Sequence, residues 1–500
     1  MPHKWWVLTR GDADTTLAQV GFNVAQMIIP VFLLAPVGIP VAFSVKMLLP
    51  GFALAFLIGS LGLAWLAVRL ARRENRTNVT AHIYGDNVPA TIAYSLSIVL
   101  PVYLSSHDAL TAWKIGAASV IWTGLFKLAA APVAGIIRRI IPQPACMAVF
   151  GAAMYSYLAL VLLQRLFDSP VVGLVGLAIV ATTALAGVPI TQWRFPPFMV
   201  AWFVPLAAGV SIGYVKPVWP GFTAGPPWVA SLGPIQSMGL ALPYLSVIAP
   251  IAIYQVLQDI ASVAGATAAG DEYDARAVLA CDGLATVLGG MAGSIITPVV
   301  YAMHPSYKNL GARIAFSIWT PLAVLAVVAS GITLFIAQLF PWPILSAMIA
   351  YVAVGVGMAT VRAVQPKYWS VLLLGFVLTT GAVVSTTMNS ALPALGLSAG
   401  NPQVGGALNR AIYWDSVQAL GNGFLFLVLV VASMITEMID RKFTRAASWC
   451  LVAAVFSWLG LMHSAAVRWG AQPQYAAGWL AAGAIVYSTQ WWRGDSTPAS

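Results

Sequence analysis

Several side chains that could bind or carry a polar solute occur in stretches of this chain that are otherwise apolar. Tyr254 and Gln258 are four residues apart, so they share one face of a predicted helix and would present a hydrogen-bonding edge to a planar polar molecule. Asp259 follows directly, and His304 begins a later apolar run. Polar groups are expensive in hydrocarbon, and those that occur there usually face a cavity or one another. We therefore expect these side chains to line a pathway for a small solute.

Three of the polar residues are titratable, which makes them candidates for coupling solute movement to an ion. Asp259 could carry a proton or a cation, or it could instead pair with a lysine away from the solute. His304 has an imidazole that donates and accepts at once, so it could bind substrate, relay a proton or serve only in packing. Asp86 is the equivalent candidate in the first half of the chain, where it could equally cap a helix. Asn23, in the first apolar run, could line the cavity or could hydrogen-bond between helices.

Two lysines also need partners. Lys127 lies in the middle of an apolar run and is expected to form a buried ion pair with an acid. Lys308, one turn beyond His304, is expected to neutralise a carboxylate rather than extend to the membrane surface. The segment Asp271 to Arg276 carries four charges among six residues, and we expect it to be solvated. The glycines of the run 279–295 predict close helix packing rather than phosphate binding.

The composition requires that most of the surface lies in lipid. Hydrophobic residues make up 60% of the 500 residues, charged residues make up 8%, and the mean hydropathy is +0.85. Soluble proteins carry about 25% charged residues. Each helical span of a bilayer takes about 20 residues, and suitable apolar runs occur at 15–36, 47–70, 88–105, 112–137, 145–166, 170–190, 197–214, 244–265, 279–295, 304–318, 319–340, 344–362, 368–386, 416–437, 446–466 and 475–490. We predict an all-α, multi-pass integral membrane protein.

The charged residues indicate an orientation and exclude several classes of function. The positive-inside rule predicts a cytoplasmic N-terminus for this protein in the inner membrane. The cytoplasmic side then holds the basic loops, with Arg69, Arg72, Arg73, Arg76, Arg138, Arg139, Arg441, Lys442 and Arg445. The net charge of +10 therefore does not indicate nucleic acid. The three cysteines lack the spacing of a disulfide framework or a zinc site. We see no Walker-type loop, nucleophile elbow or metal-ligand cluster, so we expect no enzyme, catalytic residue, metal or cofactor.

The longest interruption between apolar runs, at 215–243, divides the first fourteen runs into seven and seven. Because seven is odd, the second half would enter the membrane from the opposite face, which is typical of an inverted repeat. We therefore predict a first repeat at 1–214, a connecting loop at 215–243, and a second repeat at 244–440. The segment 441–500 would add two further spans and a polar tail.

The third run of each half begins in a similar way. Thr80 to Tyr84 and Thr297 to Tyr301 share the pattern Thr-x-x-x-Tyr, and a proline follows each. Proline disfavours the α conformation in the preceding residue, so both runs are expected to be extended and then to form half-helices. Such broken elements persist at membrane depth only when they are buried in protein or line a wet cavity, and their helix N-termini would direct partial positive charge at it. Tyr84, Asn87 and Tyr301 thereby join the candidate substrate-binding residues.

Two motifs carry a resemblance to a known family: AAGDEYDARAVLACDGLATVLGGMAGS followed by HPSYKNLGAR, and VTAHIYGDNVPATIAYSLSIVLPVY. They resemble the xanthine/uracil, or nucleobase–ascorbate, permeases, including the adenine/guanine permease branch, and the similarity covers roughly residues 5–465. The resemblance implies a core domain of spans 1–4 and 8–11 that moves against a gate domain of spans 5–7 and 12–14. It also implies elevator-type symport with a proton or sodium ion, with substrate held between the half-helices of spans 3 and 10 and against span 8.

Applied to this chain, the resemblance places Gln258 where the family has a glutamate that binds the base, and His304 where close relatives carry histidine. It also places Tyr351 at a gate aromatic near the substrate. The chain departs from the family where Asp86 replaces an apolar residue and where SIITPV replaces SPFPTT. These departures favour a nitrogen-rich solute, such as a guanidine- or urea-type compound, at least as much as a nucleobase. We expect an import permease for such a solute, acting as a homodimer.

Two alternatives remain open. A small-anion exchanger or transporter on the same fold would hold its anion with the half-helix dipoles and Lys308. A membrane sensor would bind a ligand without moving it, although the short polar tail after residue 490 predicts no signalling domain.

Overall fold

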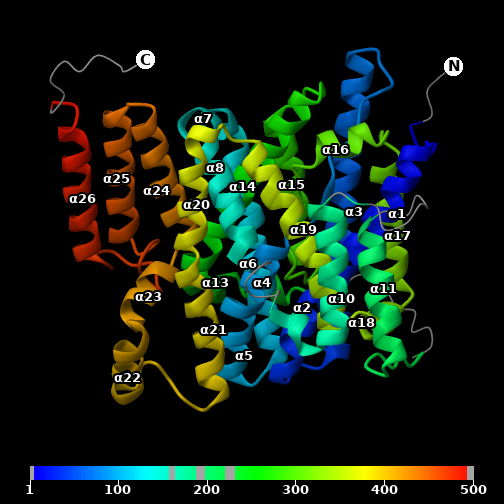
Figure 1. Cartoon of the computed structure of the whole chain (residues 1–500), viewed down its shortest axis with the longest axis horizontal. Coiled ribbons are helices and arrows are strands. Elements are labelled where there is room, and N and C mark those ends of the chain that lie inside the picture. The colour runs from blue at the N-terminus through cyan, green and yellow to red at the C-terminus, as the bar shows by residue number, and fades with distance from the viewer. Residues whose placement is uncertain (1–4, 157–163, 187, 189–196, 220–230, 492–500) are drawn as a thin grey trace. The chain divides into compact units, whose positions relative to one another are not determined.

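A computed structural model describes residues 5–156, 164–186, 188, 197–219 and 231–491 of the chain (Figure 1). The chain forms two compact units. Unit 1 comprises Met1–Ile136, Tyr157–Leu242 and Ile251–Gly355, and unit 2 comprises Ile137–Ser156, Pro243–Pro250 and Val356–Ser500.

Unit 1 contains most of the helices and both described strands. Its helices are α1 (Arg10–Met27), α2 (Ile29–Leu34), α3 (Val41–Arg73), α4 (Val88–Tyr94), α5 (Leu100–Ser106), α6 (Ala109–Ala130), α10 (Pro170–Val180), α11 (Pro197–Ser211), α12 (Gly233–Gln236), α13 (Met238–Ala241), α15 (Ala275–Met291), α16 (His304–Asn309), α17 (Phe316–Ala329) and α18 (Thr333–Leu339). Its strands are β1 (Tyr84–Asp86) and β2 (Pro298–Val300).

Unit 2 is helical in its described residues. Its helices are α8 (Gln143–Ala153), α20 (Trp369–Leu378), α21 (Thr380–Ala394), α22 (Pro402–Ile412), α23 (Trp414–Gly421), α24 (Phe424–Ile439), α25 (Phe443–Trp458) and α26 (Pro473–Ser488). Three helices contribute residues to both units: α7 (Ala134–Ile140), α14 (Leu245–Ala268) and α19 (Trp342–Arg362).

Where the structure describes them, the predicted apolar runs are largely helical, and parts of the runs 145–166 and 170–190 lie outside the described residues. Among the described residues, six helical spans are long and apolar enough to cross a membrane, and the pair α23 and α24, bent by 74°, would make a seventh. Shorter apolar helices occupy Pro170–Thr183, Trp202–Ser211 and Phe316–Ala329. Beyond these, α25 and α26 occupy the two additional C-terminal runs and pack side by side (Figure 1). The chain is therefore a multi-pass integral membrane protein.

The two interrupted runs meet as a pair of short strands. β1 and β2 are antiparallel, with Tyr84 opposite Val300 and Asp86 opposite Pro298. The pairing continues beyond the strands, since the Asn87 N–H donates to the Thr297 carbonyl at 2.8 Å. Helix α4 begins directly after β1 and continues into a span at Val88–Ser106. The prediction of an extended stretch followed by a half-helix is confirmed, whereas the hydrogen-bonded pairing of the two stretches was not predicted.

The helix of span 10 is shorter than the sequence suggested. We expected a run at 304–318, but α16 ends at Asn309 and α17 begins at Phe316. The interruption lies at Gly311, whose φ of +87° is a left-handed conformation that favours glycine and commonly ends a helix. A Cβ on Gly11 of α1 would collide with the Gly311 carbonyl carbon, so glycine at position 11 permits this close approach.

The glycines of span 9 pack α15 against its neighbours. A Cβ on Gly290 would lie 2.8 Å from the Ile121 nitrogen of α6, and one on Gly289 would lie 2.6 Å from the Ala55 Cβ of α3. Real Cβ atoms do not approach this closely, so larger residues would force the helices apart. The sequence prediction that these glycines serve close packing is confirmed.

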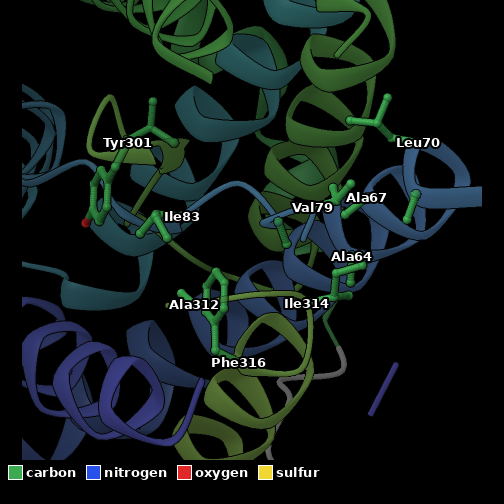
Figure 2. Packing of buried hydrophobic residues seen from close by; sticks show 12 residues of the cluster. Ala64, Ala67, Leu70, Val79, Ile83, Tyr301, Ala312, Ile314 and Phe316 are labelled. Atoms are coloured by element: carbon green, nitrogen blue, oxygen red, sulfur yellow. The ribbon is translucent and has the colours of Figure 1, made fainter. Parts of the chain in front are cut away.

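A hydrophobic cluster beside the strands joins distant segments of unit 1. The cluster contains Ala64, Ala67 and Leu70 of α3 with Val79, Ile83, Ala312, Ile314 and Phe316; in Figure 2 the α3 residues lie near Val79, and Ile83 lies towards Tyr301. Tyr301 also belongs to this hydrophobic cluster, and its hydroxyl group contacts Gln26 Oε1 at 3.0 Å. This packing holds β1 and β2 in place, and the polar side chains described below surround them.

Candidate functional site

Polar side chains from four segments surround the strand pair. We call this set the central polar cluster, and its members are Asn23 and Gln26 of α1, Asp86 of β1, Asn87, Thr91 of α4, Tyr254, Gln258 and Asp259 of α14, and Tyr301. Each member is at most 8% exposed. Buried polar groups are costly unless they are hydrogen-bonded, and the contacts between the members explain how most of them are accommodated.

Helices α1 and α14 satisfy backbone groups at the outer edges of the two strands. The Asn23 Oδ1 of α1 accepts from the Asp86 N–H of β1 at 3.3 Å. Asp259 Oδ1 accepts from the Val300 N–H of β2 at 3.1 Å, and the Ser262 hydroxyl donates to the Val300 carbonyl at 2.7 Å. An uncovered strand edge is not tolerated in hydrocarbon, because its polar groups would lack partners. These side chains therefore make the hydrogen bonds that neighbouring strands would make in a larger sheet.

Asn87 connects the start of α4 to α14. It is the N-cap residue of α4, and its Oδ1 accepts from the Ala90 N–H at 3.2 Å. Its Nδ2 donates to Gln258 Oε1 at 3.2 Å. The hydroxyl of Tyr254, one turn earlier on the same face of α14, also interacts with Asn87. The predicted shared face of Tyr254 and Gln258 is thus directed at the N-terminus of α4.

Asp86 lies at the end of β1, immediately before the N-cap residue of α4. Its Oδ1 accepts from the Thr91 hydroxyl at 2.6 Å, and its backbone carbonyl accepts from the Tyr301 hydroxyl at 2.7 Å. Among the described residues, its Oδ2 has no hydrogen-bond partner, and Asp259 Oδ2 is in the same situation. The cluster thus contains two buried carboxyl groups that each have one unsatisfied oxygen atom.

A second group, the Lys127 cluster, consists of Tyr84, Lys127, Asp282, Thr286 and the Pro298 carbonyl. Lys127 Nζ of α6 lies 2.7 Å from Asp282 Oδ2 of α15, and both side chains are 0% exposed. The same Nζ donates to the Pro298 carbonyl at 2.9 Å, and the Tyr84 hydroxyl donates to Asp282 Oδ1 at 2.6 Å. The predicted buried ion pair of Lys127 is confirmed. The ion pair attaches both strands to α6 and α15. Asp282 and Lys127 also lie close enough to Asp259 to interact with its carboxyl group.

A third group, the Asp271 cluster, consists of Asp271, Arg76, Thr80, His304 and Lys308. The Asp271 carboxylate lies 2.9 Å from an Arg76 nitrogen, 2.9 Å from His304 Nε2 and 2.7 Å from Lys308 Nζ. It also accepts from the Thr80 N–H at 3.2 Å. Lys308 therefore neutralises a carboxylate, as predicted.

The expectation that the whole segment Asp271 to Arg276 is solvated is wrong for its first residue. Asp271 is 0% exposed, whereas Glu272, Asp274 and Arg276 are exposed. Burial alone would raise the pKa of Asp271, but hydrogen bonds from His304 and Lys308 lower it to about 2. The carboxylate is consequently ionised and attaches the loop after α14 to α16 and to the segment before β1.

The candidate residues divide among these groups. Asn23, Asp86, Asn87, Tyr254, Gln258, Asp259 and Tyr301 come together in the central polar cluster. Tyr84 contacts Asp282, and His304 contacts Asp271 and the rings of His82 and Tyr273. The side chain of Tyr351 lies outside the described residues.

Sequence reasoning missed Asp282 and Asp271. Asp282 could have been found, because it is an acid within the predicted span 279–295 and Lys127 needed an acidic partner. The burial of Asp271 had no such signal, since its three basic partners come from segments distant in sequence. Among the described residues, no group of three or more His, Cys, Asp or Glu side chains is arranged to hold a metal ion.

The comparisons with known proteins found a similarity of fold. No family model matches the sequence, and no curated protein matches it. The transmembrane domain of a bicarbonate transporter from a cyanobacterium, BicA, is similar with a TM-score of 0.51 and 13% identity, over 78% of this chain and 99% of that chain. SLC26A9 is similar with a TM-score of 0.50 and 14% identity, over 84% of this chain and 65% of that chain, slightly under two thirds of its length.

These structures overturn the assignment to the xanthine/uracil permeases. The first of the two motifs behind that assignment contains packing glycines of α15 together with Asp271, His304 and Lys308, and the second contains strand β1, so both consist largely of scaffold residues. The scaffold is nevertheless the one that was predicted. The chain has the 7+7 inverted-repeat fold of membrane transporters, with core and gate domains and with spans 3 and 10 interrupted.

Proposed function

We propose that this protein is a secondary transporter that moves a small anion across the cytoplasmic membrane by alternating access. The observation that carries the proposal is the central polar cluster at the N-terminus of α4, on a fold shared with a transporter of bicarbonate. In this proposal the repeats are 1–214 and 244–440, the N-terminus is cytoplasmic, and the protein is a homodimer.

The cluster offers donors suited to an anion. Asn87 and Gln258 are amides with N–H donors, and Tyr254 has a hydroxyl. The helix that begins at Val88 continues to Ser106, so its N-terminus directs backbone dipoles toward the cluster. Negative charge is stabilised at such a terminus. These are the groups that we propose contact the solute, with Asn23 and Tyr301 beside them.

The carboxyl groups of the cluster favour coupling to a cation. Asp86 and Asp259, when ionised, would repel an anion bound beside them, and the low dielectric of the interior strengthens that repulsion. A proton or a cation that neutralises one of them would favour anion binding, and by linkage the anion would favour the cation. We therefore propose symport of the anion with a proton or sodium ion, with Asp259 as the principal coupling residue and Asp86 as the second.

Transport by purified protein in liposomes tests this function. Labelled sulfate, chloride and bicarbonate, the last at pH 8, would be offered under an inward sodium or proton gradient, with labelled uracil and protein-free liposomes as controls. We expect at least one anion to accumulate only with protein and a gradient, and uracil not to accumulate. Accumulation of uracil without that of any anion would refute the proposal.

The Asp259→Asn variant tests the coupling. We expect it to lose gradient-driven accumulation and to keep binding of the anion, because asparagine removes the titratable charge and retains the shape. Asp274→Asn, at an exposed carboxylate, is the matched control and should transport normally. Full accumulation by Asp259→Asn would show that coupling lies elsewhere.

A further inference from the structure

A basic cavity in unit 2 shares no lining residue with the three clusters described above. Its volume is about 270 Å³, and its polar lining includes Arg138, Arg139, Gln143, Tyr368, Thr436, Glu437, Asp440, Lys442 and Arg445. The proposed solute contacts of the central polar cluster contribute nothing to this lining. The cavity therefore needs an explanation of its own.

The cavity forms where several helices of unit 2 end together. Helices α8, α20 and α24 pack against one another, and α25 packs on α24 (Figure 1). Arg138 and Arg139 belong to the last turn of α7, Glu437 to the last turn of α24, and Arg445 to the start of α25. The polar lining is thus placed at the ends of apolar helices, where a membrane protein meets lipid headgroups.

The acids of the cavity already have basic partners. Asp440 lies 2.9 Å from Lys367 and 3.2 Å from Lys442, and it accepts from the Tyr368 hydroxyl at 2.6 Å. Hydrogen bonds from Lys367 and Tyr368 hold the pKa of Asp440 well below its ordinary value. Glu437, with its side chain 7% exposed, lies 3.8 Å from Lys442. Asp440 and Glu437 thus pair with lysines and not with the arginines of the cavity.

The arginines keep their positive charge available. The lining has four basic and two acidic residues, which leaves a net charge of +2. In the part of the chain that the structure describes, no ion pair involves Arg138, Arg139 or Arg445. Guanidinium groups form a planar set of donors that matches phosphate oxygens in pairs. A cavity of this kind is suited to a ligand with a compact negative charge.

We propose that this cavity binds the phosphate group of an anionic phospholipid. The lipid is favoured over free phosphate because the cavity lies at helix ends, on the face that we expect to be cytoplasmic, where anionic headgroups attract basic residues. The acyl chains of the lipid would then lie along the apolar helices next to the cavity. The proposal does not depend on which solute the protein transports.

Thermal unfolding of the purified full-length protein in a zwitterionic detergent tests the proposal. The probes are dioleoyl phosphatidylglycerol, dioleoyl phosphatidylcholine and inorganic phosphate, each titrated separately. The cavity variant is Arg138→Gln/Arg139→Gln/Arg445→Gln. The matched control is Arg69→Gln/Arg72→Gln/Arg276→Gln, which makes the same change in charge at exposed arginines outside the cavity.

We expect phosphatidylglycerol, and not phosphatidylcholine, to raise the unfolding temperature of the wild type and the control. In the cavity variant the concentration of phosphatidylglycerol needed should rise at least about tenfold, because each arginine near a headgroup contributes substantially to the attraction. Equal losses in both variants would overturn the proposal in favour of general surface attraction. Inorganic phosphate that stabilises the wild type as well as phosphatidylglycerol does would overturn the lipid assignment.

Discussion

The Lys127 and Asp271 clusters of unit 1 both neutralise a buried carboxylate, but they differ in how many bases they use. Lys127 and Asp282 are each other's ionic partner, and both are 0% exposed. Asp271 is also 0% exposed, yet it contacts three bases, of which Lys308 is 14% and Arg76 is 24% exposed. The comparison teaches that the first cluster depends on one fully buried pair, whereas the second shares its carboxylate among three bases, two of which are partly exposed to water.

The largest effect is expected from breaking the sealed pair. Lys127→Met should lower the free energy of unfolding by about 3–5 kcal/mol, because Asp282 would remain as a buried charge without its counter-ion. Unfolding in detergent, followed by tryptophan fluorescence, measures the change. The double variant Lys127→Met/Asp282→Leu removes both charges and should recover much of the loss. A single variant as stable as the wild type would contradict the comparison.

Removing the shared carboxylate should have a smaller effect. Asp271→Asn keeps the shape and removes the charge, and two of the three bases, Arg76 and Lys308, are partly exposed to water and can be solvated there. We expect a loss of about 2–3 kcal/mol, the scale of hydrogen bonds to a charged group. The same fluorescence assay measures it, with Asp274→Asn as the control at an exposed acid. A loss larger than that of Lys127→Met would reverse the order of the two clusters.

Removing one of the three bases should cost less again. His304→Ala deletes the contact with Asp271 at 2.9 Å but leaves Arg76 and Lys308 in place. We expect a loss of about 1 kcal/mol, with the KM of the transported anion changed by less than about twofold. A large rise in KM with unchanged stability would instead place the imidazole at the solute.

The last expectation is a dependence on pH that the buried Asp271 carboxylate introduces, and it is confined to acid conditions. The pKa of Asp271 is lowered to about 2 in the folded protein, whereas an unfolded aspartate titrates near 4. The stability from Asp271 is therefore complete above about pH 4 and lost as the pH falls towards 2. The difference in unfolding temperature between wild type and Asp271→Asn should be constant from pH 5 to 8 and shrink below pH 4. A difference that changes between pH 6 and 7 would contradict the assignment to Asp271.

Much of the scaffold could be predicted from the sequence, because it depends on local patterns. The apolar runs located the helices, and the prolines and glycines of spans 3 and 10 located their interruptions. The need of Lys127 for an acid was also visible from its position in an apolar run. These inferences require only that hydrocarbon excludes unpaired polar groups.

The rest depends on contacts between distant segments. Asp282 is the partner of Lys127 because α15 packs on α6, and no local pattern specifies that packing. The density of charge after α14 suggested solvation. Asp271 is nevertheless buried, because Arg76 and Lys308, from segments distant in sequence, pair with its carboxylate. The assignment of family was wrong because most residues of the motifs that supported it belong to the scaffold: the packing glycines of α15, the Asp271 cluster and strand β1. Substrate contacts contribute few residues and therefore little sequence signal.

The strand pair also constrains how the protein is made. Tyr84 of β1 pairs with Val300 of β2, which the ribosome adds 216 residues later. At about 5–20 residues per second, roughly 10–40 s pass between the synthesis of the two strands. During that interval the first half of the chain has reached the insertion machinery with the edge of β1 still lacking its partner. Biogenesis must therefore shelter this edge until the second half arrives, so the halves become stable together rather than in turn.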